Sequence, residues 1–379
     1  MDGTVLIVGA GIAGLGLARA LHLRGVRCSV LDRAPSSAAP GLGVNLPGNA
    51  VQALAALGLA EDVVRGGVPI RRREYRTGSG RLLFAVDEEA FWGSVGPSTC
   101  VYRESLLNVL RAGAAEVPTR WDTGVVGVEA VAEGVRVQLD SGATEIHDFV
   151  VGADGVRSAV RPFVLGEGPG QSGLSLSPMA ETSWRFIAPN PGVSCWTVWS
   201  GRAGTLLLIP VAEDLVYGYA SATRGGASGA DPRWLAETFT DFPEPVAQTV
   251  AAVTADERTL LHSPVLEVRC DRWSRGKVVL IGDAAHATAP VWAQGAALAL
   301  EDALVLADLL ATRSDWSGVG AAFEQRRRAR VAHVQAVTDR MTKIAGLPNG
   351  LRDVVAPVLG PRAYRAAYEP LRTPVTTSV

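Results

Sequence analysis

The apolar positions near the amino terminus change from a continuous run to a helical repeat and back again. Residues 4–8 read TVLIV, a β-branched run typical of a strand buried on both faces. Residues 15–25 read LGLARALHLRG and have the spacing of a helix, and residues 26–32 read VRCSVLD and form a second apolar run. This order of strand, helix and strand predicts a βαβ unit with parallel strands.

Three glycines, in the sequence GAGIAG, stand between the first strand and the helix. Gly9 permits a tight turn, Gly11 lets the backbone approach a pyrophosphate, and Gly14 lets the helix pack on the strand. Asp32 ends the second strand, 23 residues after Gly9, near the ~20 expected for an acid that binds a ribose hydroxyl. Together these features favour a dinucleotide site over a merely glycine-rich turn. Asp32 would repel a 2′-phosphate, which favours NAD or FAD over NADP.

The pattern changes again between Ser175 and Arg269. Short runs rich in Trp and Tyr, such as SWRFIAP, CWTVWS and LVYGYASA, alternate with Pro and Gly turns, which is typical of an antiparallel sheet. The stretch KVVLIGDAAH then returns to a buried strand, and helical patterns follow. We therefore expect an α/β fold: a nucleotide-binding domain of residues 1–174 and 271–345, an inserted β-sheet domain of residues 175–270, and a C-terminal helical tail of residues 346–379 packed on the core.

Composition narrows the class of protein. The 379 residues are 47% apolar with a formal net charge of -2, which fits a globular protein and gives no support for nucleic-acid binding. The four cysteines lie far apart without a CxxC pair, so we expect reduced thiols, a cytoplasmic location and no metal site. We expect neither a signal peptide nor a membrane span, because glycines and Arg19 interrupt the first apolar stretch.

One helix near the carboxyl terminus carries a basic cluster, Arg326, Arg327, Arg328 and Arg330. These arginines point around the helix, whereas Phe323, Val331, Val334, Val337 and Met341 form an apolar stripe on it. The pattern favours a solvated helix docked on the core over a membrane-binding or phosphate-binding site.

Three ordered segments carry a family resemblance: GAGIAG, VVGADGVRSAVR, and VVLIGDAAHATAP followed by QGAALALEDALVLADLL. They resemble the FAD-dependent aromatic hydroxylases among the single-component flavoprotein monooxygenases, including the salicylate hydroxylase-like and urate hydroxylase-like enzymes. The resemblance implies a Rossmann-type FAD-binding domain with an inserted substrate-binding sheet. It also implies non-covalent FAD, NADH or NADPH as co-substrate, and oxygen transfer from O2 to an aromatic substrate through a C4a-hydroperoxyflavin.

The same resemblance implies which residues hold FAD. Arg103 would reach the pyrophosphate or ribityl region, Asp283 would bind a ribityl hydroxyl, and Asp154 would serve both FAD and the nicotinamide nucleotide. As an alternative, either acid caps the helix that follows it. A helix beginning near residues 294–297 would direct free N–H groups at the reduced flavin. The expected cofactor residues are Gly9, Gly11, Gly14, Asp32, Arg33, Arg103, Asp154, Gly282, Asp283, Gly295, Ala296 and Ala297.

Candidates for the substrate pocket come from the aromatic sheet and from the loop after the last strand. Tyr217 and Tyr219 share a strand face, whereas Trp196 and Trp199 lie on opposite faces. Arg185 alternates with Trp184 and Phe186, and it either binds a substrate acid or phenolate or is an exposed strand charge. The expected catalytic residues are Pro290, Arg185 and Tyr217, and the expected pocket residues are Trp184, Trp196, Tyr219 and Trp292.

Departures from the family pattern limit the choice of substrate. Val291 stands where urate hydroxylase-like enzymes tend to carry an acid, Ala293 stands where many members have glycine, and Trp292 is unusually large for its position. We read Trp292 as a pocket wall or, alternatively, as core filling, and His286 as a hydrogen-bonded structural residue rather than a base. The pattern favours an extended aromatic or polycyclic substrate over a purine.

Other functions remain open at this level. A flavin-dependent halogenase is disfavoured because no WxWxIP segment is present. A flavoprotein reductase or oxidase without oxygen insertion is one alternative, and a flavin-bound protein that sequesters its ligand is another. For the assembly we expect a monomer or a homodimer.

Overall fold

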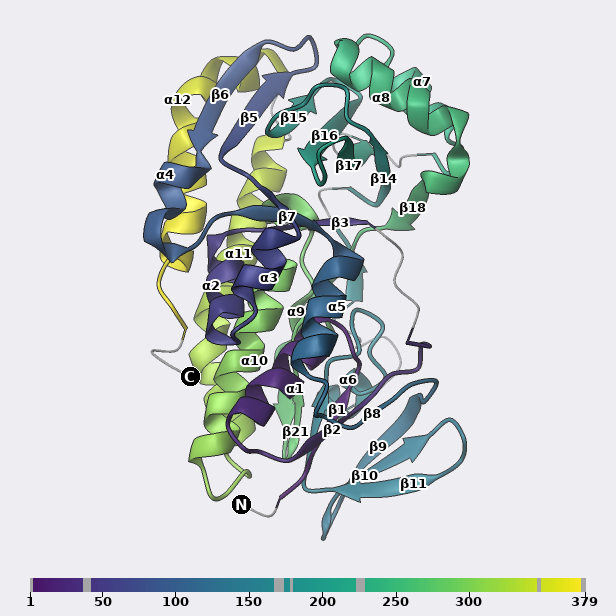
Figure 1. Cartoon of the computed structure of the whole chain (residues 1–379), viewed down its shortest axis with the longest axis vertical. Coiled ribbons are helices and arrows are strands. Elements are labelled where there is room, and N and C mark those ends of the chain that lie inside the picture. Colours follow the sequence, from purple (N-terminus) through teal and green to yellow (C-terminus); the bar gives the residue numbers. More distant parts are fainter. Residues whose placement is uncertain are drawn as a thin grey trace.

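The computed structural model describes residues 3–36, 42–166, 174–177, 180–222, 229–345 and 349–375. A nucleotide-type sheet with its helices lies at the end that holds the amino terminus, and a second sheet lies at the opposite end (Figure 1). Two long C-terminal helices lie on one side of the molecule: α11 (Val319–Ala345) contacts the first sheet, and α12 (Asn349–Tyr368) packs beside β6 of the second (Figure 1). The predicted α/β class with an inserted sheet and a C-terminal helical segment is confirmed.

The first sheet has six strands in the order β20-β21-β12-β1-β2-β8. Strand β1 pairs in parallel with β2 and β12, which confirms the predicted βαβ unit, and all four residues of β1 are buried. Helix α1 (Ile12–Leu23) follows β1 and packs against α10 (Gly295–Thr312). The strands are β1 Val5–Val8, β2 Cys28–Leu31, β8 Thr119–Arg120, β12 Phe149–Gly152, β20 Ser274–Arg275 and β21 Val278–Leu280.

The second sheet has seven strands in the order β18-β14-β17-β16-β15-β5-β6. One face of this sheet packs against helices, and the other lines a cavity. Trp184, Phe186 and Trp199 pack in an apolar cluster with residues of α7 (Arg233–Phe239) and α8 (Glu244–Ala255), whereas Arg185 and Tyr219 face a cavity. The strands are β5 Arg72–Thr77, β6 Leu82–Asp87, β14 Thr182–Pro189, β15 Trp196–Ser200, β16 Gly204–Pro210, β17 Leu215–Ala222 and β18 Leu261–Pro264.

Strands β5 and β6 come from residues 72–87, which lie within the range expected for the nucleotide-binding domain. Strand β5 nevertheless pairs in parallel with β15 of the inserted sheet, and β6 pairs with β5. The inserted sheet is therefore mostly antiparallel, as expected, with one parallel pair. The charged sequence RRREYR does not have the pattern of a buried strand. Arg73 is nevertheless buried, because it forms an ion pair with Glu88 and lies over the Trp196 ring.

The remaining elements connect or cover these sheets. Strand β3 (Gly43–Leu46) pairs with β7 (Thr99–Tyr102) and lies near the cavity between the two sheets. The others are β4 Val68–Pro69, β9 Val125–Val131, β10 Gly134–Leu139, β11 Thr144–His147, β13 Leu174–Leu176, β19 Leu266–Val268, α2 Gly48–Ala56, α3 Ala60–Arg65, α4 Glu88–Trp92, α5 Arg103–Gly113, α6 Arg161–Leu165, α9 Asp283–His286 and the 3-10 helices η1 Gly93–Val95, η2 Glu257–Thr259, η3 Pro290–Trp292 and η4 Glu369–Leu371.

The arginines of the basic cluster of α11 point around the helix, as expected, with Arg326 exposed and Arg327 turned into the protein. Arg327 is fully buried and forms ion pairs with Asp302 and Glu301, and Arg330 also pairs with Glu301. Buried guanidinium groups need such partners. The helix docks on the core as expected. None of the helices in the described part of the chain is long and apolar enough to cross a membrane.

Candidate functional site

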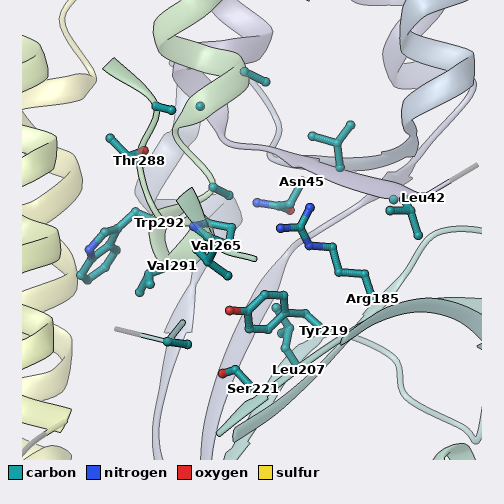
Figure 2. Close-up of a pocket in the computed structure, with 18 of the residues that line it drawn as sticks. Leu42, Asn45, Arg185, Leu207, Tyr219, Ser221, Val265, Thr288, Val291 and Trp292 are labelled. Carbon is teal, nitrogen blue, oxygen red and sulfur yellow. The ribbon is translucent and has the colours of Figure 1, made fainter. Parts of the chain in front are cut away.

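A cavity of about 690 Å³ lies between the first sheet and the second. One side of it is formed by the glycine loop after β1, the start of α5, and the loop from β21 to α10. The other side is formed by the second sheet and by β3, and Figure 2 shows the side chains that converge there. A single cavity therefore joins some of the expected cofactor residues, such as Gly11, Arg103 and Asp283, with most of the expected substrate residues.

The three loop glycines have different surroundings, and those of Gly9 and Gly14 leave no room for a side chain. Gly9 has φ +108°, and a Cβ on it would lie 2.5 Å from the Ala153 carbonyl oxygen. A Cβ on Gly14 would lie 1.8 Å from the Gly9 carbonyl oxygen, so helix and strand need this glycine for close packing. A Cβ on Gly11 would meet no protein atom within 4 Å and would point into open space. The backbone at Gly11 thus forms a cradle that a pyrophosphate fits.

Asp32 and Arg33 lie at the end of β2, outside the lining of the cavity. The two Asp32 carboxylate oxygens accept the backbone N–H groups of Ala10, at 2.6 Å, and Ala34, at 2.8 Å. These bonds fix the carboxylate beside the glycine loop, where a ribose hydroxyl would reach it. Arg33 is exposed.

Arg103 and Asp283 are the charged residues on the cofactor side of the cavity. Arg103 begins α5, and among the described residues it has no carboxylate within ion-pair distance. Burial lowers the pKa of Arg103, and the charge of Asp283 opposes this shift. Enclosure by the cavity walls raises the pKa of Asp283, while His286, Arg103 and Arg185 act against the rise. An unpaired guanidinium and an enclosed carboxyl suit a phosphate and a hydroxyl-rich chain, respectively.

Behind Asp283 lies a buried polar network that the sequence did not reveal as such. Asp302 accepts the Gly282 backbone N–H at 2.9 Å, and His286 Nε2 lies 2.6 Å from the same carboxylate oxygen. Arg327 Nε donates to the other Asp302 oxygen at 2.7 Å. These contacts favour the structural role for His286 over that of a base, because its Nε2 is occupied by Asp302.

The loop from Pro290 to Gln294 leads into α10. Pro290 opens onto the cavity, and Gly295 and Ala296 line it, whereas Ala297 is buried behind them. Ala293 has φ +51° and ψ +33°, a left-handed conformation that favours glycine. Gln294 is held by hydrogen bonds with Asn49 of α2, which itself donates to Glu301. The first turn of α10 is therefore fixed with its N–H groups at the cavity.

On the substrate side, β14 and β17 present Arg185 and Tyr219 from directly paired positions. Tyr217 lies on the same face, and its Cβ would be 2.5 Å from a Cβ on Gly43 of β3, so the two elements meet without space for a side chain. Burial raises the pKa of Tyr217 to about 12, so its hydroxyl stays protonated at neutral pH. Trp196 also lines the cavity, whereas Trp199 packs on the opposite face, as strand alternation predicts.

Trp184 is a correction to the expected pocket. It packs in the cluster on the far face of the second sheet, and its Nε1 donates to the Gly229 carbonyl. Strand alternation explains this outcome: Arg185 faces the cavity, so its neighbour Trp184 must face away.

Trp292 also differs from the pocket-wall interpretation. Its side chain is part of the main apolar cluster, is 7% exposed, and meets the Tyr368 ring edge-on at 5.6 Å. In Figure 2 the indole points away from Arg185 and Tyr219 toward the C-terminal helices, although the residue borders the cavity. The structure favours the core-filling alternative.

Asp154 lies behind the cavity wall that Ala153 and Gly155 form. One carboxylate oxygen accepts the backbone N–H groups of Ala159 and Val160, which lie in the turn before α6, so Asp154 fixes this turn and does not cap the helix itself. The other oxygen is buried without a partner among the described residues, and burial raises the pKa of the group.

Two buried residues that line the cavity escaped the sequence analysis. Asn45 lies in the segment LGVNLPGNA, in which no chemical motif marks it, and Arg73 belongs to a run that reads as surface charge. Arg73 is held by Glu88 at 2.5 Å and by the Tyr368 hydroxyl at 3.0 Å, and it lies over the Trp196 ring. Only tertiary pairing of β5 with β15 could place it there.

Comparisons with known proteins agree with this geometry. A family model described as "FAD binding domain" matches residues 2–341. The 2-heptyl-3-hydroxy-4(1H)-quinolone synthase of Pseudomonas aeruginosa is 33% identical over 88% of this chain and 87% of its own. Aurachin C monooxygenase/isomerase of Stigmatella aurantiaca is 31% identical over 91% and 90%. The structure of Klebsiella pneumoniae HpxO with FAD and uric acid superposes with a TM-score of 0.82 at 25% identity, covering 98% and 92% of the two chains. The chain belongs to the family of FAD-dependent aromatic monooxygenases.

Proposed function

We propose that this chain uses FAD, NADH or NADPH, and O2 to insert one oxygen atom into an aromatic or polycyclic small molecule. The main observation that supports this proposal is the cavity, which places Gly11, Arg103 and Asp283 opposite Arg185 and Tyr219. No wall separates the two groups of residues, so a ligand on the sheet side would lie against the cofactor.

The chain's own residues would hold the cofactor as follows. The Gly11 backbone and the amino terminus of α1 bind the pyrophosphate, and Arg103 offsets its charge. Asp283 binds a ribityl hydroxyl, and the free N–H groups of α10 face the flavin ring and favour negative charge on it. When bound, FAD supplies the redox chemistry, because it takes hydride from the nicotinamide nucleotide and activates O2.

On the other side, Arg185 would orient the substrate through an acceptor oxygen, such as a phenolate, carbonyl or carboxylate. Among the described residues, no carboxylate lies within ion-pair distance of Arg185, so its charge is available to a ligand. Apolar side chains complete the wall and exclude water: Val198, Leu207, Ile209, Val265, Leu266 and Val291. The bicyclic ring and seven-carbon chain in the name of the quinolone synthase suit such a wall better than a purine does.

The test is a screen of aromatic compounds for stimulated NADH or NADPH oxidation by the FAD-loaded protein. We expect phenolic or carbonyl-bearing bicyclic compounds to stimulate oxidation in the wild type, and Arg185→Ala to lose that stimulation while it keeps its FAD. A reductase or oxidase would turn over without forming an oxygenated product. Tight ligand binding without stimulated oxidation would indicate a sequestering protein and would overturn the proposal.

We also propose a cytoplasmic location, which the four cysteines support because all of them are free thiols. For the assembly we propose a monomer or a homodimer. Size-exclusion chromatography with light scattering decides between the two assemblies.

A further inference from the structure

Asn45 is a buried amide that the protein leaves unsatisfied. Its side chain is 5% exposed, and both Nδ2 and Oδ1 lack a hydrogen-bond partner among the described residues. A buried amide without partners is costly, so such groups are rare unless a ligand satisfies them. Asn49, on the next element, shows the contrast, because its buried amide bonds to Gln294 and Glu301.

The surroundings of Asn45 indicate what that ligand contacts. Asn45 lines the cavity, and Figure 2 shows its amide and the Arg185 guanidinium pointing toward one another from β3 and β14. No hydrogen bond joins the two residues, and the Arg185 Nε is also buried without a partner among the described residues. Two unsatisfied polar groups therefore face the same part of an otherwise largely apolar cavity.

We propose that Asn45 is a specificity-determining residue that pairs with an adjacent donor and acceptor on one edge of the aromatic substrate, such as a lactam or an ortho-aminophenol. This inference rests on the proposed function. The Asn45 side chain offers an N–H2 donor and a carbonyl acceptor. A single edge of a ligand satisfies both only if it carries an acceptor beside a donor. Arg185 can only donate, so it takes the acceptor oxygen of that edge.

The pyrimidine side of the flavin ring also carries a donor beside an acceptor. The flavin is therefore a second possible partner of the Asn45 amide. The position of Asn45 opposite Arg185 of the inserted sheet favours the substrate. The experiment must separate the two sources by measuring FAD binding independently of probe binding.

The experiment titrates FAD-loaded protein with two isosteric probes and follows the flavin absorbance. The first probe, 2(1H)-quinolinone, carries an N–H beside its carbonyl, and the second, coumarin, has a ring oxygen in place of the N–H. We expect the wild type to bind 2(1H)-quinolinone at least about tenfold more tightly than coumarin, because coumarin leaves one Asn45 atom unpaired. Asn45→Leu should bind the two probes within about twofold of each other, whereas Asn45→Asp, which keeps an acceptor for the lactam N–H, should still bind 2(1H)-quinolinone more tightly than coumarin.

Two further measurements complete the design. Ser221→Ala removes a cavity-lining hydroxyl that lies beyond Tyr219 in Figure 2, and it should keep the wild-type preference. FAD affinity and the probe-free flavin spectrum should be the same in Asn45→Leu and the wild type. Equal binding of both probes by the wild type, or no binding of the lactam, would overturn the proposal. A changed FAD affinity or spectrum would assign Asn45 to the flavin instead. A failure of the proposed function would differ from both, because the protein would not consume NADH or NADPH with any compound.

Discussion

Ala293 shows how a single backbone conformation departs from what its residue favours. A left-handed conformation costs an alanine about 1–2 kcal/mol, and Ala293 adopts it at φ +51°. We expect Ala293→Gly to raise the free energy of unfolding by up to about 1 kcal/mol, measured by urea denaturation, because relief of this strain outweighs the larger chain entropy that glycine loses on folding. Ala252→Gly, on the exposed side of α8, should lower it by about 1 kcal/mol. Equal losses in both variants would contradict the strain at Ala293.

Gly11 and Gly14 provide a matched pair for the cofactor loop. Gly11→Val adds a side chain in open space, so the protein should fold with a near-normal melting temperature but lose most of its FAD. Gly14→Val should fail to fold stably, because its Cβ would overlap the Gly9 carbonyl. Absorbance of the purified proteins at the flavin bands, with circular dichroism, checks both. Full FAD occupancy in Gly11→Val would disprove the role of the loop.

Trp292 is expected to matter for stability more than for the pocket. Trp292→Ala removes a nearly fully buried indole and should cost about 3–5 kcal/mol. Trp292→Phe should cost much less, since the indole N–H has no partner among the described residues. Thermal denaturation measures both. If Trp292→Ala instead kept its melting temperature and released more hydrogen peroxide per NADH or NADPH consumed, the pocket-wall interpretation would return.

At the scale of elements, a buried hydrogen bond joins α12 to the loop before α10. The Tyr368 hydroxyl donates to the Trp292 carbonyl at 2.7 Å and accepts from Arg73 at 3.0 Å, and burial raises the pKa of Tyr368 to about 12. Tyr368→Phe leaves a buried carbonyl and a buried guanidinium group short of a partner, so we expect a loss of about 1–3 kcal/mol in the free energy of unfolding. An unchanged urea midpoint would show that α12 is not held by this hydroxyl.

The strands that the sequence predicted have one of two patterns. They are either apolar runs buried on both faces or strict alternations of inward-facing and outward-facing residues. Strands β1 and β21 read as apolar runs. Alternation places Arg185 and Trp184 on opposite faces of β14, which excludes Trp184 from the pocket where it was expected. Strand β5 could not be found this way, because Glu88, Tyr368 and Trp196, which make its Arg73 tolerable inside the protein, come from distant parts of the chain. Asn45 was missed for a similar reason, since its lack of partners is a tertiary property.

At the scale of the whole molecule, Asp302 links α9, α10 and α11 through buried charges. Burial by itself raises the pKa of Asp302, but His286, Arg327 and hydrogen bonds outweigh it, so the folded pKa lies below the ordinary value. The unfolded chain then takes up the proton first, and stability present above about pH 4 is lost as the pH falls through the folded pKa. Asp302→Asn should flatten this part of the pH profile and lower stability at pH 7 by about 3–5 kcal/mol, because Arg327 loses a buried partner. A wild-type pH profile in Asp302→Asn would contradict the assignment.

The central claim is that the cavity between the two sheets supports oxygen insertion by FAD into a ligand held at Arg185. The most direct measurement is the mass of the product formed from a stimulating aromatic compound in an atmosphere of ¹⁸O2. The account predicts a product that gains one ¹⁸O atom, with NADH or NADPH consumed. A product that carries oxygen from water, or one that is dehydrogenated without added oxygen, would contradict it.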